Sequence, residues 1–238
     1  MTASKYTISG CTVADGQALA ANNIPAFWED PHWRLSWRHR TLEYHISQVT
    51  KRFPRNLLND RETTRHQKVI DTETGRLIGY ARWHIPPDHA TLPDGTPAWP
   101  EAVIPAVSPE EEAELNRIAE TAHWDPNLES DVQFEPVRAI KKPILARKPY
   151  MRLDYLAVHP DNQRKGAATA LVQSGMRVAE KLGLDIFIHA MKAGVELYKR
   201  QGFRIEAELV QDDSMYGGTG EYYVCMMTYE QKSPSNVE

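Results

Sequence analysis

The residues best suited to chemistry lie where a predicted strand turns into a predicted helix, between positions 153 and 168. The first turn of a helix presents unpaired backbone N–H groups and a partial positive charge, so it binds anions such as phosphate. Gly166 and the two alanines after it would let a phosphate approach the backbone, and Arg164 and Lys165 add positive charge nearby. The stretch predicts an anion site, while a plain tight turn is the alternative interpretation.

The run QRKGAA at 163–168 fits the pattern Arg or Gln, two residues, Gly, one residue, Gly or Ala. It resembles the acetyl-CoA signature of the GNAT N-acetyltransferases. The preceding LAVHP at 156–160 extends the resemblance, and LYKRQGF at 197–203 is similar to the family's later Tyr and Gly-Phe element. The resemblance covers about 150–229 and is absent from 86–149.

The resemblance implies acetyl-CoA as acyl donor and one α/β domain over residues 1–238. Its fold would be a GNAT-like, mixed and mostly antiparallel central sheet of about seven strands, flanked by helices. In such proteins the strand before the signature splays from its neighbour and exposes backbone to the pantetheine arm. A backbone N–H of that strand would stabilise the oxyanion of acyl transfer. The residues implied to bind the cofactor are Leu156, Ala157, Val158, Gln163, Arg164, Lys165, Gly166, Ala167 and Ala168.

Two further residues are implied to be catalytic, Asp154 and Tyr198. An alkylamine has a pKa of about 10.4, so presenting it neutral at pH 7 costs about 4 to 5 kcal/mol. Asp154 would accept the proton or hold the ammonium; the alternative is a structural ion pair with Arg152. Tyr198 precedes the Gly-Phe pair, from where its hydroxyl would assist the departing sulfur. Its alternative role is packing between helix and core.

The composition narrows the class of protein. Lys and Arg number 28 against 32 Asp and Glu, a net charge of −4, which disfavours nucleic acid or an anionic membrane as partner. No apolar run is long enough to span a membrane, and the first ten residues lack a secretory apolar segment, so a cytoplasmic protein is expected. Cys11 and Cys225 are expected to be free and buried. His84 and His89 lack a third ligand, so no metal is predicted.

Hydrophobic periodicity and turn residues predict the elements. Strands are expected over 5–13, 66–71, 76–85, 152–158, 185–189, 203–210 and 221–229, and helices over 15–22, 35–51, 163–182 and 193–201. Eleven of the sixteen prolines fall within 86–149. That density predicts an insertion on the acceptor side, a semi-rigid lid with one short helix that begins at Ser108-Pro109. The tail 232–238 is expected to fray.

The expected function is transfer of an acetyl group from acetyl-CoA to a primary amine of a small molecule, by direct attack in a ternary complex. Protein acetylation at a lysine or an N-terminus is the alternative within the same fold, and a non-catalytic acyl-CoA-binding module is the alternative outside enzymes. A monomer or a homodimer is expected. All six tryptophans precede the signature, and we assign Trp37 and Trp83 to the core.

Overall fold

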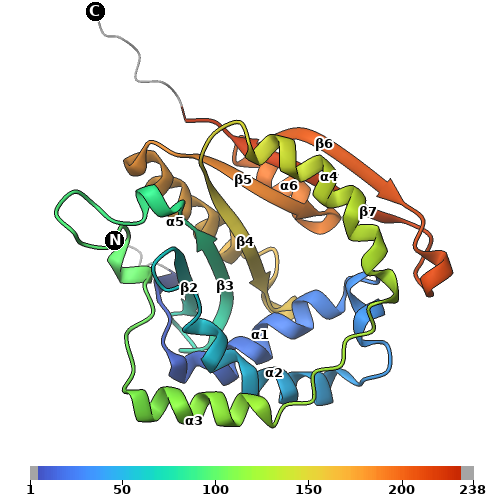
Figure 1. Ribbon diagram of the computed structural model, residues 1–238, viewed down its shortest axis with the longest axis horizontal. Coiled ribbons are helices and arrows are strands. Elements are labelled where there is room, and N and C mark those ends of the chain that lie inside the picture. The colour runs from blue at the N-terminus through green and yellow to red at the C-terminus, as the bar shows by residue number, and fades with distance from the viewer. Residues whose placement is uncertain (1–4, 232–238) are drawn as a thin grey trace, which may run out of the picture.

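The computed structural model describes residues 5–231, and the predicted frayed tail at 232–238 lies outside them. Seven strands form one sheet, with helices on both faces (Figure 1). The strands are β1 (Tyr6–Gly10), β2 (Thr64–Asp71), β3 (Leu77–His84), β4 (Tyr150–Val158), β5 (Asp185–Met191), β6 (Arg204–Gln211) and β7 (Tyr222–Tyr229). The helices are α1 (Gly16–Trp28), α2 (Leu42–Leu57), α3 (Pro109–Glu120), α4 (Phe134–Leu145), α5 (Ala167–Leu182) and α6 (Lys192–Arg200).

The strand order is β1-β2-β3-β4-β5-β7-β6. Every neighbouring pair is antiparallel except β4 and β5, which run parallel. Parallel neighbours need a crossover connection, and α5 supplies it. The predicted mixed, mostly antiparallel sheet of seven strands is therefore confirmed.

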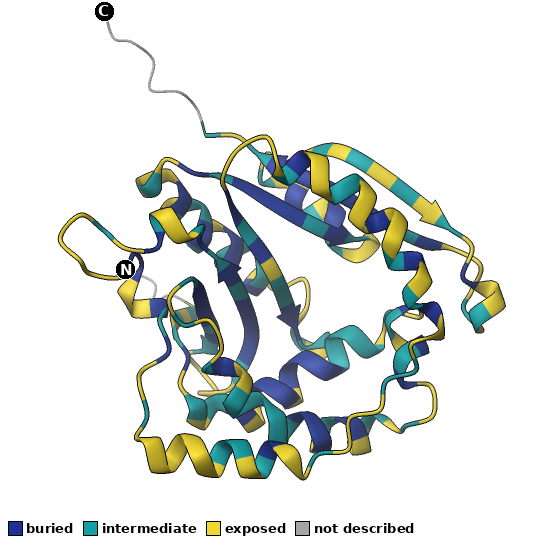
Figure 2. Cartoon of the chain, in the orientation of Figure 1, coloured by how far each residue is buried: buried dark blue, intermediate teal, exposed yellow. Residues whose placement is uncertain are grey.

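The two faces of the sheet carry different helices. We call the side covered by α5 and α6 the α5 face, and the side covered by α1, α2 and α4 the α4 face. In Figure 1, α4 crosses in front of β5 and β7 and α6 lies behind them. Because side chains alternate along a strand, Ile186 and Ile188 of β5 join the core of the α5 face, whereas Phe187 packs toward α4. Both faces are therefore buried along β5, as Figure 2 shows.

One close approach locks α5 onto the sheet. The Trp83 side chain on β3 is fully buried, and a Cβ added at Gly175 of α5 would lie 2.1 Å from its ring. Only glycine therefore fits at this crossing. Trp37 is also buried, at 5% exposure, so both tryptophans lie in the core as expected. Cys11 and Cys225 are free and buried, which confirms that prediction.

The proline-rich segment 86–149 divides into parts that lie on both faces. Residues 90–102 pack beneath α5, and the buried guanidinium of Arg65 donates to the carbonyl oxygens of Ala98 at 2.6 Å and Ala90 at 3.2 Å. Helix α3 begins after the Ser108 cap, as predicted, and packs against α2 with its outer surface exposed (Figure 2). A second helix, α4, was not predicted, and it covers the outer half of the α4 face.

Four helix boundaries differ from the sequence prediction by four residues or more, and two of these are the end of α2 at Leu57 rather than 51 and the start of α5 at Ala167 rather than 163. Helix α1 continues to Trp28, six residues past its expected end, and contains Pro25. Helix α2 begins at Leu42 rather than near 35, because the Thr41 side chain accepts a hydrogen bond from the Tyr44 N–H at 3.2 Å and caps it there. One 3-10 helix, Trp33–Trp37, lies between these two helices.

Candidate active site

The central feature of the site is the divergence of β4 from β5. Their parallel pairing ends at Leu153 and Ile188. Beyond this point β4 continues to Val158 against β3, and β5 continues to Met191 against β7. Past the last β4–β5 pair, the facing edges of the two strands carry backbone N–H and C=O groups that are not bonded across the sheet. Backbone groups of this kind require hydrogen-bond partners. The facing backbone edges of β4 and β5 therefore have no ladder between them beyond Leu153 and Ile188, and we call this divergence the slot.

A β-bulge lies where the strands part. On β3, Arg82 pairs with Tyr155 and Trp83 with Leu153, so Asp154 has no partner residue across the pair. A bulge places two successive side chains toward one face. Tyr155 contacts Phe27 of α1, with ring centroids 4.6 Å apart, so the bulge presents β4 side chains to the α4 face at the mouth of the slot.

The predicted anion site is built as a glycine turn at the start of α5. Gly166 has a φ of +97°, and its carbonyl accepts the Ala170 N–H at 3.0 Å. By helix geometry the N–H groups before Ala170 have no carbonyl within the helix and point outward. A Cβ built at Gly166 would meet only a Tyr6 ring carbon, at 3.8 Å, so the space beside Gly166 is open.

The turn before Gly166 is held in place by its own contacts. Arg164 also has a positive φ, +59°, and its side chain is exposed. Tyr6 donates from its hydroxyl to the Lys165 carbonyl at 2.5 Å. The Lys165 ammonium donates to the Asp161 carbonyl at 2.6 Å, so its charge lies along the turn. The residues at 163–168 thus fit a phosphate group by shape, backbone donors and charge.

Asn22 fixes the end of β4 and was not singled out by the sequence. This buried side chain of α1 donates to the Ala157 carbonyl at 3.3 Å and accepts the His159 N–H at 3.2 Å. Of the three predicted residues on this strand, Leu156 and Val158 join the core of the α5 face, and Ala157 is buried. All three lie on the diverging part of β4.

The Tyr198 side chain lies at the end of the sheet where β4 and β5 diverge. A Cβ added at Gly194, one turn earlier, would lie 2.8 Å from a Tyr198 ring carbon, so the ring lies over the first turn of α6. That turn follows directly on the last residue of β5, which is on the slot. Burial raises the pKa of the Tyr198 phenol well above its usual value, so the hydroxyl keeps its proton near pH 7. The ring also packs against Phe203, as the packing alternative expects.

Asp154 lies on the α4 face and forms an ion pair with Arg152, at 3.7 Å. The pairing anticipated as the structural alternative is therefore present. Both side chains are about 30% exposed, so the carboxylate remains accessible to a ligand. His189 lies one residue beyond the last β4–β5 pair, and burial lowers its pKa to about 4, which leaves the ring neutral at pH 7.

Comparison with known proteins identifies the family. A sequence model of the acetyltransferase (GNAT) family matches residues 28–203. The chain belongs to this family. No curated protein matches the sequence.

Solved structures agree on the fold of this acetyltransferase. A structure described as histone acetyltransferase HPA2 and related acetyltransferase from Corynebacterium glutamicum has 16% identity and a TM-score of 0.57, covering 98% of this chain and 99% of that one. A Drosophila melanogaster polyamine N-acetyltransferase that forms N-acetylagmatine has 13% identity and a TM-score of 0.52, covering 95% and 100%. The C-terminal condensation domain of Ebony, bound to beta-alanyl-dopamine, has 14% identity and a TM-score of 0.53, covering 94% and 99%.

Residues 5–231 contain neither a membrane-spanning helix nor a cluster of metal-binding side chains. No helix there is both long and apolar enough to cross a membrane. No group of three or more His, Cys, Asp or Glu side chains in this part of the acetyltransferase is arranged to hold a metal ion.

An aromatic cluster lies beside the α4 face. The rings of Trp28, Trp33, Trp37 and Trp124 all contact His45. Burial is the largest cause that lowers the pKa of His45, to about 4, so the imidazole packs as a neutral ring. Most of the acetyltransferase's tryptophans therefore build the helical layer around α1 and α2.

A buried contact, which we call the His32–Asp213 latch, joins two distant loops. His32 follows α1, Asp213 lies between β6 and β7, and the two side chains meet at 3.1 Å with Asp213 fully buried. Asp213 also accepts the Gly220 N–H at 2.8 Å, and the His32 ring stacks on Tyr222 with centroids 3.4 Å apart. The latch closes the α4 face on the side of β7.

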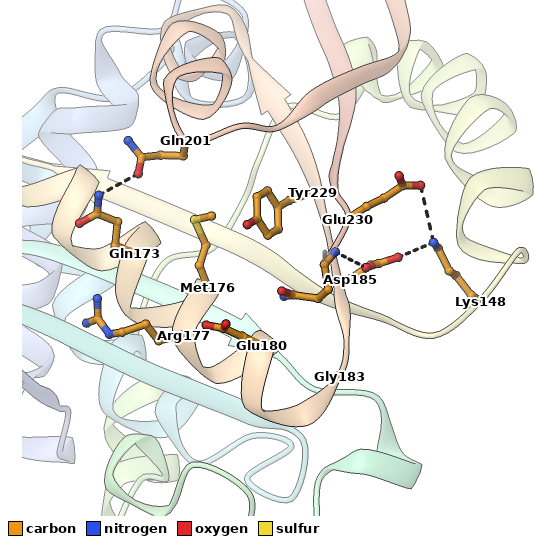
Figure 3. Close-up of a pocket in the computed structure, with 11 residues that line it drawn as sticks. Lys148, Gln173, Met176, Arg177, Glu180, Gly183, Asp185, Gln201, Tyr229 and Glu230 are labelled. Carbon is orange, nitrogen blue, oxygen red and sulfur yellow. Dashed lines mark hydrogen bonds and ion pairs between the residues drawn. The ribbon is translucent and has the colours of Figure 1, made fainter. Parts of the chain in front are cut away.

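The hollow in Figure 3 lies at the other end of the acetyltransferase. Its volume is about 910 Å³, and it is lined by the C-terminal half of α5 and the ends of β7 and α6. Two pairs of its polar side chains contact each other: Gln173 donates to Gln201 at 2.9 Å, and Lys148 forms an ion pair with Asp185. Because Gly166 precedes the N-terminus of α5 and the hollow lies along its C-terminal half, the hollow is remote from Gly166 and from the slot.

The latch gives a stability prediction. Replacing Asp213 by Ala leaves the buried His32 nitrogen and the Gly220 N–H without their acceptor, so the free energy of unfolding should fall by about 2 to 4 kcal/mol. The exposed neighbour supplies the control: Asp212→Ala should cost less than about 1 kcal/mol. Urea unfolding measures both, and equal losses would contradict the assignment of the latch.

Proposed function

We propose that the protein transfers the acetyl group of acetyl-CoA to a primary amine of a small molecule, with the amine attacking directly while both substrates are bound. The observation that carries this proposal is the slot between β4 and β5, which opens beside the glycine turn at Gly166. The backbone of 156–158 would hold the pantetheine arm, and the amides of 164–168 the pyrophosphate. Acetyl-CoA supplies the acetyl group as a thioester.

The reaction would need a proton acceptor for the amine and a hydrogen-bond donor for the leaving sulfur, and these would lie on different faces of the sheet. On the α4 face, the Asp154 carboxylate would hold the incoming ammonium and accept its proton, directly or through water. On the α5 face, the protonated Tyr198 hydroxyl would donate a hydrogen bond to the sulfur as it leaves. Backbone N–H groups of Leu156 or Ala157 would stabilise the negative charge on the carbonyl oxygen.

The latch supports a small acceptor rather than a protein. An extended peptide needs a groove open at both ends. Here the loop after α1 is tied to the loop between β6 and β7 by the buried His32–Asp213 pair, which closes one end of the α4 face. The helix α4 covers the neighbouring part of the same face. Within the proline-rich segment, α4 would be the part nearest the acceptor.

The cofactor assignment predicts the effect of a charge at Gly166. Gly166→Glu puts a carboxylate where the pyrophosphate would bind, so the Kd for CoA should rise at least about 100-fold. Asn tolerates a positive φ, so Gly166→Asn is the matched control without charge and should weaken binding far less. Calorimetric titration with CoA, alongside circular dichroism for folding, is the measurement. Unchanged affinity in a folded Glu variant would remove the assignment.

The role of Tyr198 is tested by removing only its hydroxyl. Tyr198→Phe keeps the packing against Phe203, so kcat should fall about 100- to 10,000-fold while the Kd for CoA stays nearly constant. Tyr44→Phe, at an exposed tyrosine on α2, is the control and should leave kcat unchanged. Normal turnover by Tyr198→Phe would return this residue to a packing role.

The role of Asp154 is tested through pH. If the carboxylate takes the proton of the amine, the loss of kcat/KM in Asp154→Asn should shrink as pH rises from 6 to 9, because more of the acceptor arrives neutral. Pre-steady-state rates measured across this range separate the roles. A loss of the same size at every pH would leave Asp154 as an anchor for the ammonium.

A further inference from the structure

Charged side chains from three elements gather on the α4 face where β4 leaves β5. Arg152 of β4 pairs in register with Phe187 of β5, and His189 follows two residues later on the same side of that strand. The Lys141 side chain extends from α4 toward β5, and its ammonium lies 5.7 Å from the centroid of the Phe187 ring. Asp154 completes the group through its 3.7 Å contact with Arg152.

Some ring and guanidinium nitrogen atoms of this group have no hydrogen bond within residues 5–231, although Arg152 also contacts Asp154 at 3.7 Å. Within residues 5–231, the Arg152 Nε and the His189 Nε2 are buried without a hydrogen bond. Lys141 is half-buried, and its ammonium lies over the face of the Phe187 ring. Burial lowers the pKa of Lys141, and the neighbouring Arg152 lowers it further while Asp154 acts in the opposite direction. Buried donors of this kind are costly unless a ligand satisfies them.

The charge balance of the group favours an anion. Arg152 and Lys141 contribute two positive charges, Asp154 contributes one negative charge, and His189 is neutral because its pKa is about 4. One positive charge therefore remains uncompensated beside the carboxylate assigned to the amine. A guanidinium presents paired N–H donors that match a planar carboxylate.

We propose that the acceptor is an amino acid, whose carboxylate is bound by Arg152 and Lys141 while its amine lies at Asp154. The inference rests on the proposed function and names the substrate class for the same site. The short distance between Arg152 and Asp154 favours an amine and a carboxylate that are close together in one small molecule. A polyamine would instead bring a second positive charge against two cations, which disfavours it.

The first experiment compares acceptors that differ only in the carboxylate. Phenylalanine and phenethylamine, tyrosine and tyramine, and β-alanine and ethylamine are assayed with acetyl-CoA by release of free thiol, and spermidine represents polyamines. In each pair the acid should have the higher kcat/KM, by about 10- to 100-fold. Equal or better transfer to the decarboxylated partners or to spermidine would overturn the inference and leave the proposed function intact.

The second experiment removes one cation. Lys141→Met keeps the aliphatic length, so it should raise the KM of the acid at least about 10-fold and reduce its preference over the decarboxylated amine. Lys142→Met, at the exposed neighbouring position on α4, is the matched control and should change neither value. An unchanged preference in Lys141→Met would overturn the assignment of this lysine and of the carboxylate site.

Binding measurements keep the two proposals separate. Calorimetric titration with phenylalanine and with phenethylamine, in the presence of CoA, reports recognition without turnover. Tighter binding of phenylalanine that weakens in Lys141→Met supports the inference even if no acetylated product forms, a result that would overturn only the proposed transfer. Absence of any binding preference overturns the inference.

Discussion

The arrangement of the whole site depends on one feature, the early end of the pairing between the two parallel neighbours β4 and β5. Their ladder stops at Leu153 and Ile188, while β4 continues against β3 to Val158 and β5 continues against β7 to Met191. Every residue that we propose to have a chemical role is placed relative to this divergence. The glycine turn follows the end of β4, Tyr198 follows the end of β5, and Asp154 sits in the bulge where the strands separate.

The parts of the molecule that the sequence predicted are those with local causes. The seven strands and the α5 helix follow from short-range periodicity, and the glycine turn at 163–168 follows from residue types that a helix start needs. Helix α4 was missed because Pro136 and Pro143 favour a loop on local grounds. Its formation depends on burying Val137 and Ile144 against β7, which is a tertiary contact that no window of sequence contains.

The contacts that complete the site have no local cause at all. Asn22 meets Ala157 across 135 positions of the chain, and His32 meets Asp213 across 181. A single polar residue in a helix or loop has no periodicity from which its partner could be inferred. The bulge at Asp154 is similar, since it becomes visible only once the register with β3 is known. Residue types therefore led to the proposed chemistry, whereas register and long-range pairing determine where those residues are brought together.

Helix α4 has a consequence for how this protein can change over evolution. The same twelve residues close the apolar core over Phe187, Val224 and Met226 and carry Lys141 to the polar group below. Substitutions that reshape this helix would therefore act together on folding and on the proposed choice of acceptor. Drift toward a new acceptor along α4 is restricted to exchanges that preserve its buried side, so its exposed and half-buried positions are the ones free to diversify.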